Sequence, residues 1–363
     1  MTTNSCITGL AGSMLGRGLA ALIAILVGSP AHADVLLVTA NRSGQLHRID
    51  TAANSRTSAD VGGHPHEVVR LHDAAAQKAV AVVSLYGPGI YNDNPRPDNG
   101  LVVVELPSMT VRHRRNVRDQ RALHGLATVP QTAAAGRSGA PHSELLVTSD
   151  VGGVLLRVEP LAGSGHLVPK AVVDVAGPCH WVVVPAGSGL AFTSNKATRF
   201  LSVVDLAHDK RVGTIGLPRG AQHLAATPDG TTLLVADHSE PVLHVVDVAG
   251  RSVDTTIPLT APPGWVSISP DGTRAVVSAF TIESDPDRPG TVDVIDIEKR
   301  ENLKTIRVGR WPFGSAFSAD SRTVYVANYK DETVSQVDVV DGRQTGTFDA
   351  PGGPESVLVV SSP

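Results

Sequence analysis

The chain has 363 residues, of which 42% are hydrophobic and 4% aromatic, and its 31 basic and 35 acidic side chains give a formal charge of −4. This balance disfavours a polyanionic partner, because nucleic-acid binding usually requires a basic stripe with interleaved aromatic residues. The densest basic run, residues 112–121, is expected to be a solvated outer strand and loop. We therefore expect no nucleic-acid partner.

The first 33 residues are predicted to be a cleaved secretory signal. Residues 1–18 contain Arg17 and no acid, residues 19–27 are apolar, and Ala31, His32 and Ala33 form a small-x-small cleavage pattern before Asp34. The apolar run is shorter than the about 20 residues that span a bilayer. We expect a periplasmic or secreted protein with no transmembrane segment, in which Cys179 is the one remaining cysteine and no internal disulfide forms.

From Asp34 onward, short strands with alternating polar and apolar residues recur with a period of about 40 residues. Three strands are predicted at 35–39, 44–50 and 55–61. Groups of four strands then begin near His66, His124, His180, His223, Trp265 and Phe313, and a lone strand follows at 355–360. Pro228-Asp229-Gly230 and Pro270-Asp271-Gly272 supply the residues that a tight hairpin turn requires.

This repeat predicts an all-β fold with one domain over residues 34–363. A repeat of four alternating strands is typical of a β-propeller blade, so we predict a seven-bladed β-propeller of four-stranded antiparallel blades. The seventh blade is split between the two ends of the sequence. Pairing the C-terminal strand with the N-terminal strands closes the ring and removes its open edges. We expect this ring to be a monomer.

The repeat also resembles that of the YVTN family of β-propellers. The resemblance rests on Tyr325-Val326-Ala327-Asn328, on Thr333 to Asp338 and on Gly353 to Val357, and it covers nearly all of residues 34–363. It implies the propeller fold. Such propellers serve as ligand-binding, surface and periplasmic proteins, as subunits of redox enzymes and, in related lactonase-like groups, as enzymes, so the resemblance implies no single function.

Candidate chemistry lies at the beginnings of the innermost strands, which converge on the mouth of the central channel. Four of them carry histidine, and a divalent transition metal needs three or four imidazole or carboxylate ligands. We expect metal ligands at His66, His124, His180 and His223. Glu67 and Glu355 are the carboxylates that would complete the metal's ligand shell or act as general base.

The register of these histidines leaves an alternative open. Counted from the proline-equivalent position, His66 and His124 come one residue later, whereas His180 and His223 come two residues later. Successive strand residues point to opposite faces, so the four rings need not share the channel. Each histidine could instead be structural, with its ring hydrogen-bonded to the backbone of a neighbouring blade.

Aromatic residues are the expected walls of a pocket, because the rest of the chain contains few. These are Tyr86, Tyr91, Trp181 and Trp265. The first two belong to an insertion at 86–100, and further insertions occupy 131–141 and 283–289. Four residues that follow second strands are expected to accept hydrogen bonds from turns: Asp150, Asn195, Asp237 and Asn328. Cys179 is expected to be a small buried apolar residue.

These observations leave two functions open. In the first, the channel mouth binds a small polar ligand, with or without a histidine-bound divalent metal, and in a catalytic version hydrolyses or isomerises a small substrate such as a lactone. In the second, the ring is a non-catalytic scaffold that docks a protein partner through its inserted loops. No serine-hydrolase elbow, phosphate-binding loop or haem-attachment motif is present in the sequence.

Overall fold

The computed structural model describes residues 34–73, 77–89, 94–129, 144–161, 168–279 and 287–360. The predicted signal, Tyr91, and the insertion at 131–141 lie outside the described residues, as does the insertion at 283–289 up to residue 286. Within these ranges every regular element is a β-strand, and no helix could span a membrane.

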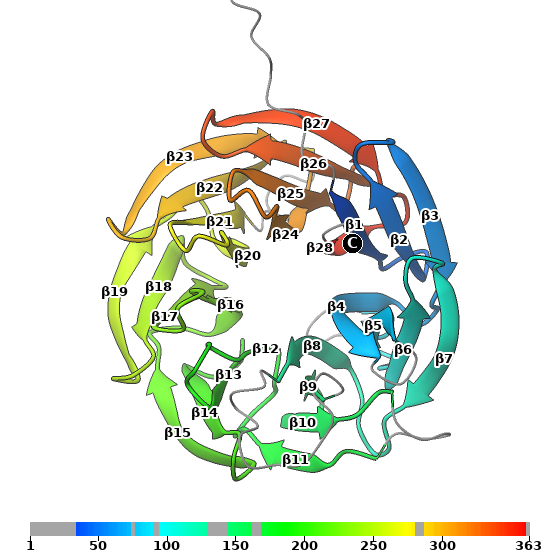
Figure 1. Ribbon diagram of the computed structural model, residues 1–363. Helices are drawn as coiled ribbons and strands as arrows, with labels where there is room; N and C mark the ends of the chain where they lie inside the picture. The colour runs from blue at the N-terminus through cyan, green and yellow to red at the C-terminus, as the bar shows by residue number, and fades with distance from the viewer. Residues whose placement is uncertain are drawn as a thin grey trace, which may run out of the picture. The chain divides into compact units, whose positions relative to one another are not determined.

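The strands form seven four-stranded antiparallel sheets arranged in a ring, which confirms the predicted seven-bladed β-propeller (Figure 1). The first three complete blades are β4 (Pro65–Asp73), β5 (Lys78–Leu85), β6 (Gly100–Glu105) and β7 (Thr110–Asn116); β8 (Leu123–Thr128), β9 (Leu145–Ser149), β10 (Val154–Val158) and β11 (Ala171–Asp174); and β12 (Trp181–Val183), β13 (Leu190–Ser194), β14 (Phe200–Asp205) and β15 (Lys210–Gly216). The fourth to sixth are β16 (Ala221–Ala226), β17 (Thr232–Asp237), β18 (Val242–Asp247) and β19 (Ser252–Pro258); β20 (Pro263–Ile268), β21 (Arg274–Ala279), β22 (Gly290–Asp296) and β23 (Glu301–Val308); and β24 (Pro312–Phe317), β25 (Thr323–Asn328), β26 (Thr333–Asp338) and β27 (Arg343–Asp349).

The seventh blade joins the two ends of the sequence, as predicted. Its order is β28 (Pro354–Val360), β1 (Val35–Ala40), β2 (Gln45–Asp50) and β3 (Ser55–Asp60). Strand β28 pairs antiparallel with β1, with Val360 opposite Val35 and Leu358 opposite Leu37. The N-terminal strands therefore have no open inner edge, which would otherwise invite pairing with another chain.

The core lies between neighbouring blades. Leu234, Leu243 and Ile257 of the fourth blade pack against Val277 and Ile295 of the fifth, and similar buried clusters recur around the ring. Full burial of each such side chain stabilises the folded state by roughly 1.5–3 kcal/mol relative to leaving it exposed. The middle strands are therefore buried along most of their length, whereas outer strands such as β19 alternate exposed residues with half-buried ones.

The predicted turns form as expected. Asp229 and Asp271 accept backbone N–H bonds from Thr231 at 3.1 Å and Thr273 at 2.9 Å. The following glycine in each turn, Gly230 or Gly272, has a φ near +70°, a conformation that glycine adopts without strain.

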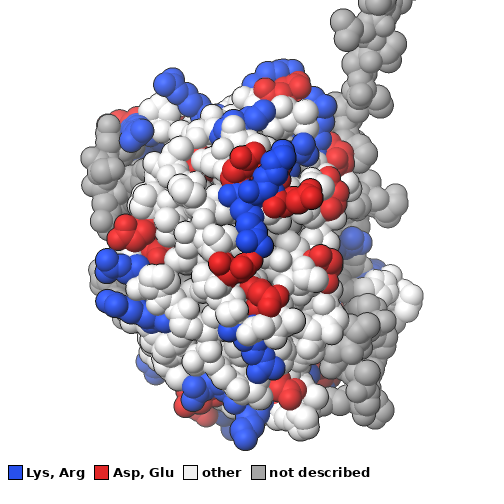
Figure 2. Space-filling model, turned by 90° about the vertical axis from the view of Figure 1, so that its left-hand side faces the viewer, with Lys and Arg blue, Asp and Glu red and all other residues white. Residues whose placement is uncertain are grey.

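The outer surface carries charges of both signs. The basic run at 112–121 begins on outer strand β7, where Arg112 pairs with Asp73 at 2.5 Å and Arg114 pairs with Asp98 at 2.7 Å. On the opposite side of the ring, Figure 2 shows basic and acidic residues interspersed. One such ion pair joins Arg300 and Asp254 at 2.5 Å.

Candidate functional site

Three of the four predicted histidines occupy equivalent places where an innermost strand begins. A hydroxyl of the preceding blade donates a hydrogen bond to each backbone carbonyl: Thr39 to His66 at 3.0 Å, Ser84 to His124 at 2.7 Å and Thr148 to His180 at 2.9 Å. In the next blade Ser194 donates to Gln222 at 3.0 Å, so His223 stands one residue further along. His180 is therefore in phase with His66 and His124, whereas the sequence count placed it with His223.

The innermost strands that carry His66, His124 and His223 pair irregularly with their neighbours. The pairing of the innermost strand shifts register between Pro65 and Val68, between Leu123 and Leu126, and between Ala221 and Leu224. A β-bulge re-aims side chains, so alternation along the strand no longer predicts which face a residue occupies. The histidines of β4, β8 and β16 all lie inside these irregular segments.

The rings of His66, His124 and His180 contact one another in a row, each tilted against the next, and we call this row the histidine stack. Ring centroids are 3.9 Å apart between His66 and His124 and 3.8 Å apart between His124 and His180, with interplanar angles of 44° and 41°. Gly125 permits this approach, since a Cβ there would lie 3.0 Å from the Cα of Trp181 and 3.1 Å from the carbonyl oxygen of His180. The stack joins three consecutive blades.

A carboxyl group lies at each end of the histidine stack. His66 Nε2 is 3.6 Å from Glu355 Oε2, and His180 Nδ1 is 3.5 Å from Asp150 Oδ2. Asn41 donates to Glu355 Oε2 at 3.2 Å. With exposed fractions of 15% and 11%, the side chains of His66 and Glu355 are more accessible than the His180–Asp150 pair, at 4% each. Solvent therefore reaches the stack from the His66 end.

Asp150 is a site residue that the sequence analysis assigned to a turn. The corresponding Asn195 and Asp237 do accept turn N–H groups, from Ala197 at 2.7 Å and Ser239 at 2.9 Å. After β9, the Ser149 hydroxyl takes this role for Gly152 at 3.2 Å, and Asp150 instead accepts a bond from the Tyr86 hydroxyl at 3.0 Å. Ser194 likewise precedes Asn195, so the preceding serine gave no signal that would set Asp150 apart in the sequence.

The predicted aromatic walls adjoin the histidines, apart from Tyr91, which is not described. Tyr86 lies edge-on to His66 and His124, at centroid distances of 5.5 and 5.2 Å. Trp181 lies 4.8 Å from His124 and 4.4 Å from His223, which in turn stacks on Trp265 at 4.1 Å. His223 therefore belongs to an aromatic cluster beside the stack, and its Nδ1 accepts a bond from the backbone N–H of Val266 at 3.4 Å. This last bond is the structural role considered as the alternative.

Burial sets the protonation of the site. It lowers the pKa of His66 to about 3 and that of His180 to about 4, with further lowering by Lys196 in both cases, and it holds the pKa of His124 and His223 well below the usual range. All four imidazoles are therefore neutral at pH 7. Burial raises the pKa of Glu355 to about 8, against the opposing hydrogen bond from Asn41, so this carboxyl is mostly protonated at pH 7.

Lys196 is a second residue that the sequence analysis did not identify. It follows β13, and its charge acts on all three imidazoles of the stack. Burial lowers the pKa of Lys196 to about 8, while Asp150 and Glu355 oppose that shift. A lone lysine in a loop carries no signal in sequence, because its neighbours come from other blades.

Glu67 lies in the seam between the first and seventh blades. Its Oε1 accepts bonds from the Ser356 hydroxyl at 2.8 Å and the Val68 N–H at 3.1 Å. Burial raises the pKa of Glu67 to about 8 although both bonds oppose this shift. Of the two predicted carboxylates, Glu355 therefore lies beside the histidine stack. Glu67 instead links the first blade to the seventh through its bond with Ser356.

Among the described residues, no three or more His, Cys, Asp and Glu side chains are arranged to hold a metal ion. Imidazoles that share a tetrahedral ion, with bonds of about 2.0–2.1 Å, have ring centroids roughly 5 Å apart. The stacked rings are closer than this, so they would have to rotate apart to coordinate one ion. Cys179 is a buried free thiol whose pKa is raised by burial, and it packs in a hydrophobic cluster as expected.

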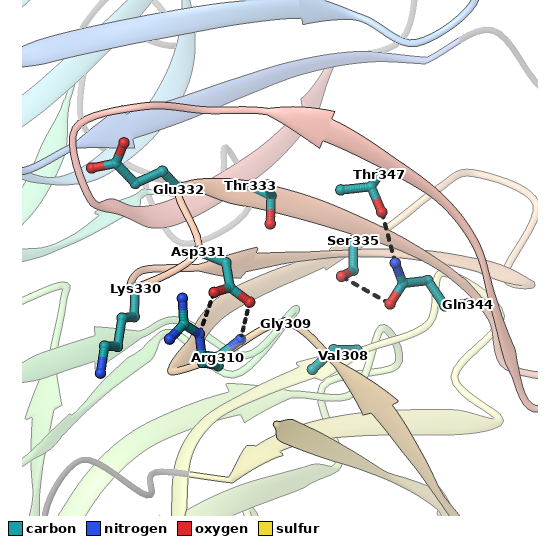
Figure 3. Close-up of a pocket in the computed structure, with 10 residues that line it drawn as sticks. All are labelled: Val308, Gly309, Arg310, Lys330, Asp331, Glu332, Thr333, Ser335, Gln344 and Thr347. Atoms are coloured by element: carbon teal, nitrogen blue, oxygen red, sulfur yellow. Dashed lines mark hydrogen bonds and ion pairs between the residues drawn. The ribbon is translucent and has the colours of Figure 1, made fainter. Parts of the chain in front are cut away.

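A pocket of about 500 Å³ lies at the outer rim, between β23 and strands β26 and β27 (Figure 3). Its charged and amide side chains bond to one another or to nearby residues. Arg310 pairs with Asp331 at 2.5 Å, and Gln344 donates to Thr347 at 2.7 Å. Lys330 pairs with Asp287 at 3.0 Å. This pairing gives no indication of a ligand class.

The fold and the ring of strand beginnings define a seven-bladed β-propeller with a histidine-rich axial site. No protein-family model matches the chain. Antigen Lp49 from Leptospira interrogans is 24% identical over 145 residues, which are 37% of this chain and 31% of the antigen, so the match spans about a third of the antigen's length.

Two solved structures share the fold. A chain of Kuenenia stuttgartiensis hydrazine synthase superposes with a TM-score of 0.64 at 14% identity, covering 83% of this chain and 96% of that one. A protein of unknown function from Desulfotomaculum acetoxidans gives a TM-score of 0.70 at 11% identity, covering 91% of this chain and 100% of that one. At these sequence identities the structural similarity establishes the fold only. Any statement about activity has to rest on the residues of the site.

Proposed function

We propose that the protein binds a small polar ligand where the histidine stack meets Glu355, and that a divalent transition metal mediates this binding. His66, His124, His180 and His223 would be the metal-binding side chains. The observation that carries the proposal is the convergence of neutral imidazoles from consecutive blades beside a buried carboxyl group. Neutral imidazole is the form that binds metal.

Two further observations support this proposal. The Nδ1 atoms of His66 and His124 are buried and have no hydrogen-bond partner within the described ranges. Leaving such a group unsatisfied costs about 1–3 kcal/mol, which a bound ligand would offset. The 3.6 Å between His66 Nε2 and Glu355 Oε2 is too long for a hydrogen bond, and it is close to the roughly 3.0–3.4 Å between two ligands of one ion.

In a catalytic version of this proposal, the metal would polarise a carbonyl of a small substrate such as a lactone. Glu355, mostly protonated at pH 7, would supply a proton to the leaving oxygen and recover it from the attacking water. Burial raises the pKa of Glu67 to about 8 as well, so Glu67 would raise the pKa of Glu355 through its charge only above that pH. Metal binding can be measured without any substrate turnover, so the first test addresses metal binding.

The test is elemental analysis of untagged protein, followed by calorimetric titration with Zn²⁺, Cu²⁺ and Ni²⁺. We expect about one equivalent of metal, lost in a His66→Ala, His180→Ala double variant. His208→Ala is the matched control, because His208 is an exposed surface histidine that pairs with Asp205 at 2.8 Å. A metal-free protein that also fails to bind added metal would refute the metal proposal.

Small-ligand binding has its own readout. Trp181 and Trp265 adjoin His223, so a ligand at this site should change tryptophan emission. We expect saturable changes with small carbonyl compounds that are largely lost in Trp181→Phe, because Trp181 lies 6.1 Å from His66 and 4.8 Å from His124. No response from any ligand class in the metal-loaded protein would instead favour the scaffold function.

We also infer that the chain is exported through residues 1–33 and that its repeat belongs with the YVTN family. The supporting observations are the apolar run, the small-x-small motif and the Tyr325-Val326-Ala327-Asn328 sequence. Amino-terminal sequencing of the exported protein should begin at Asp34.

A further inference from the structure

A second cavity lies between the seventh and first blades, near the ends of β4 and β28 away from His66 and Glu355. It has a volume of about 610 Å³, and we call it the seam pocket. The residues that line it include Val35, Leu37, Leu106, Val360, Arg48 and Arg70. Its volume is within the about 300–1,000 Å³ typical of small-molecule sites.

The apolar wall of the seam pocket continues the core between the two blades. Val35, Leu37 and Val360 belong to the same buried cluster as Val83 and Val104, and Leu106 packs against it. An alkyl chain in the pocket would therefore extend an existing hydrophobic core, at about 0.8 kcal/mol for each CH₂ fully removed from water.

The rim of the seam pocket is basic. Arg48 stands opposite Leu37 in the pairing of β1 and β2, so its side chain is on the same face of the sheet as that apolar wall. Throughout the described ranges neither Arg48 nor Arg70 forms an ion pair. Lys78 and Glu105 also line the pocket and are paired with each other at 2.5 Å. Two arginines thus remain available to an anion.

We propose that the seam pocket binds an amphiphile with one anionic head group, such as a medium-chain alkyl carboxylate. The alkyl chain would lie against Val35, Leu106 and Val360, and the carboxylate would face Arg48 and Arg70. An apolar pocket with a few placed charges selects for a ligand with both features. This site is separate from the histidine stack and does not depend on the function proposed for it.

The test measures dodecanoate binding to the full protein by calorimetry, below the concentration at which dodecanoate forms micelles. Dodecanol and dodecyltrimethylammonium carry the same chain without the anion. We expect dodecanoate to bind at least about tenfold more tightly than either. Hydrogen bonds to charged groups contribute more free energy than neutral ones, and the difference corresponds to about tenfold in affinity. Equal binding of dodecanol, or no dodecanoate binding, would overturn the proposal.

Two variants locate the site. Arg48→Gln with Arg70→Gln should weaken dodecanoate binding about tenfold, and Ala79→Phe, which fills the apolar side of the pocket, should weaken it by a similar factor. The matched control is Arg211→Gln with Arg307→Gln, two exposed arginines on outer strands. Variants that stay folded by circular dichroism yet keep wild-type affinity would show that dodecanoate binds elsewhere, which also overturns the proposal.

Discussion

Asp150 and Asp237 hold corresponding places after second strands, yet their carboxylates bond to different groups. Asp237 accepts the turn N–H groups of Ser239 and Glu240 at 2.9 and 3.1 Å and faces His244 Nε2 at 3.1 Å. Asp150 faces Tyr86 and His180. Asp237 therefore stabilises its own blade. Asp150 instead links Tyr86, which follows β5, to His180 of the histidine stack.

The bond between Tyr86 and Asp150 should be measurable as a coupling energy. Hydrogen bonds to charged groups contribute about 1.5–3 kcal/mol, and a double-mutant cycle isolates the pair. We expect Tyr86→Phe and Asp150→Asn each to lower the free energy of unfolding, with the double variant losing less than the sum. Urea denaturation of the four proteins gives these values. Strictly additive losses would show that the two side chains do not interact.

Asp237 should make stability depend on pH. Burial by itself would raise its pKa, but hydrogen bonds from Ser239, His244 and Glu240 outweigh burial and hold the pKa below its usual value. A carboxyl group with a lowered folded-state pKa contributes stability above its unfolded pKa of about 3.9 and loses that contribution as pH falls through the folded pKa.

We therefore expect Asp237→Asn to cost about 1–3 kcal/mol at pH 7 and progressively less below about pH 4. Chemical denaturation at pH 7, 5 and 3.5 measures the difference. The control is Asp254→Asn, which removes a more exposed carboxylate paired with Arg300 and should change stability by less than about 1 kcal/mol. A pH-independent loss in Asp237→Asn would contradict the lowered pKa.

Strand β28 closes the ring. It pairs with β1 along Val357 to Val360, and its Ser356 hydroxyl bonds to Glu67 of β4 at 2.8 Å. It thus contacts both the N-terminal blade and the first complete blade. Without β28, β1 would become an open inner edge of the sheet. The two hydrophobic clusters that contain Val360 and Val357 would each lose buried residues.

Removal of residues 354–363 should therefore lower the melting temperature by more than about 10 °C. The estimate follows from losing several kcal/mol of burial, with about 2–4 °C for each kcal/mol in a domain of roughly 150–250 residues. Calorimetry of the truncated protein gives the shift, and removal of residues 361–363 serves as control. A change of one or two degrees would mean that ring closure contributes little.

At the scale of the whole molecule, the ring should unfold as one unit. Residues 33–363 form one compact unit in which each innermost strand contacts the next around the ring. Tryptophan fluorescence reports on three different blades, through Trp181, Trp265 and Trp311. Far-ultraviolet circular dichroism reports on all strands together. We expect the two signals to give coincident thermal transitions, as a cooperative unit requires. Separate midpoints would indicate independently unfolding segments.

The sequence by itself determined the seven blades, the strand order and the closure of the ring. These depend on local signals, namely period-two alternation, the Pro-Asp-Gly turns and the split repeat at the two ends, and each acts over a few residues. The tertiary structure decided which side chains meet at the axis. The bulges at Pro65–Val68 and Leu123–Leu126 broke the alternation, and neighbouring blades brought Asp150, Lys196 and Asn41 to the histidines. Those contacts join residues far apart in the chain, and no local pattern encodes them.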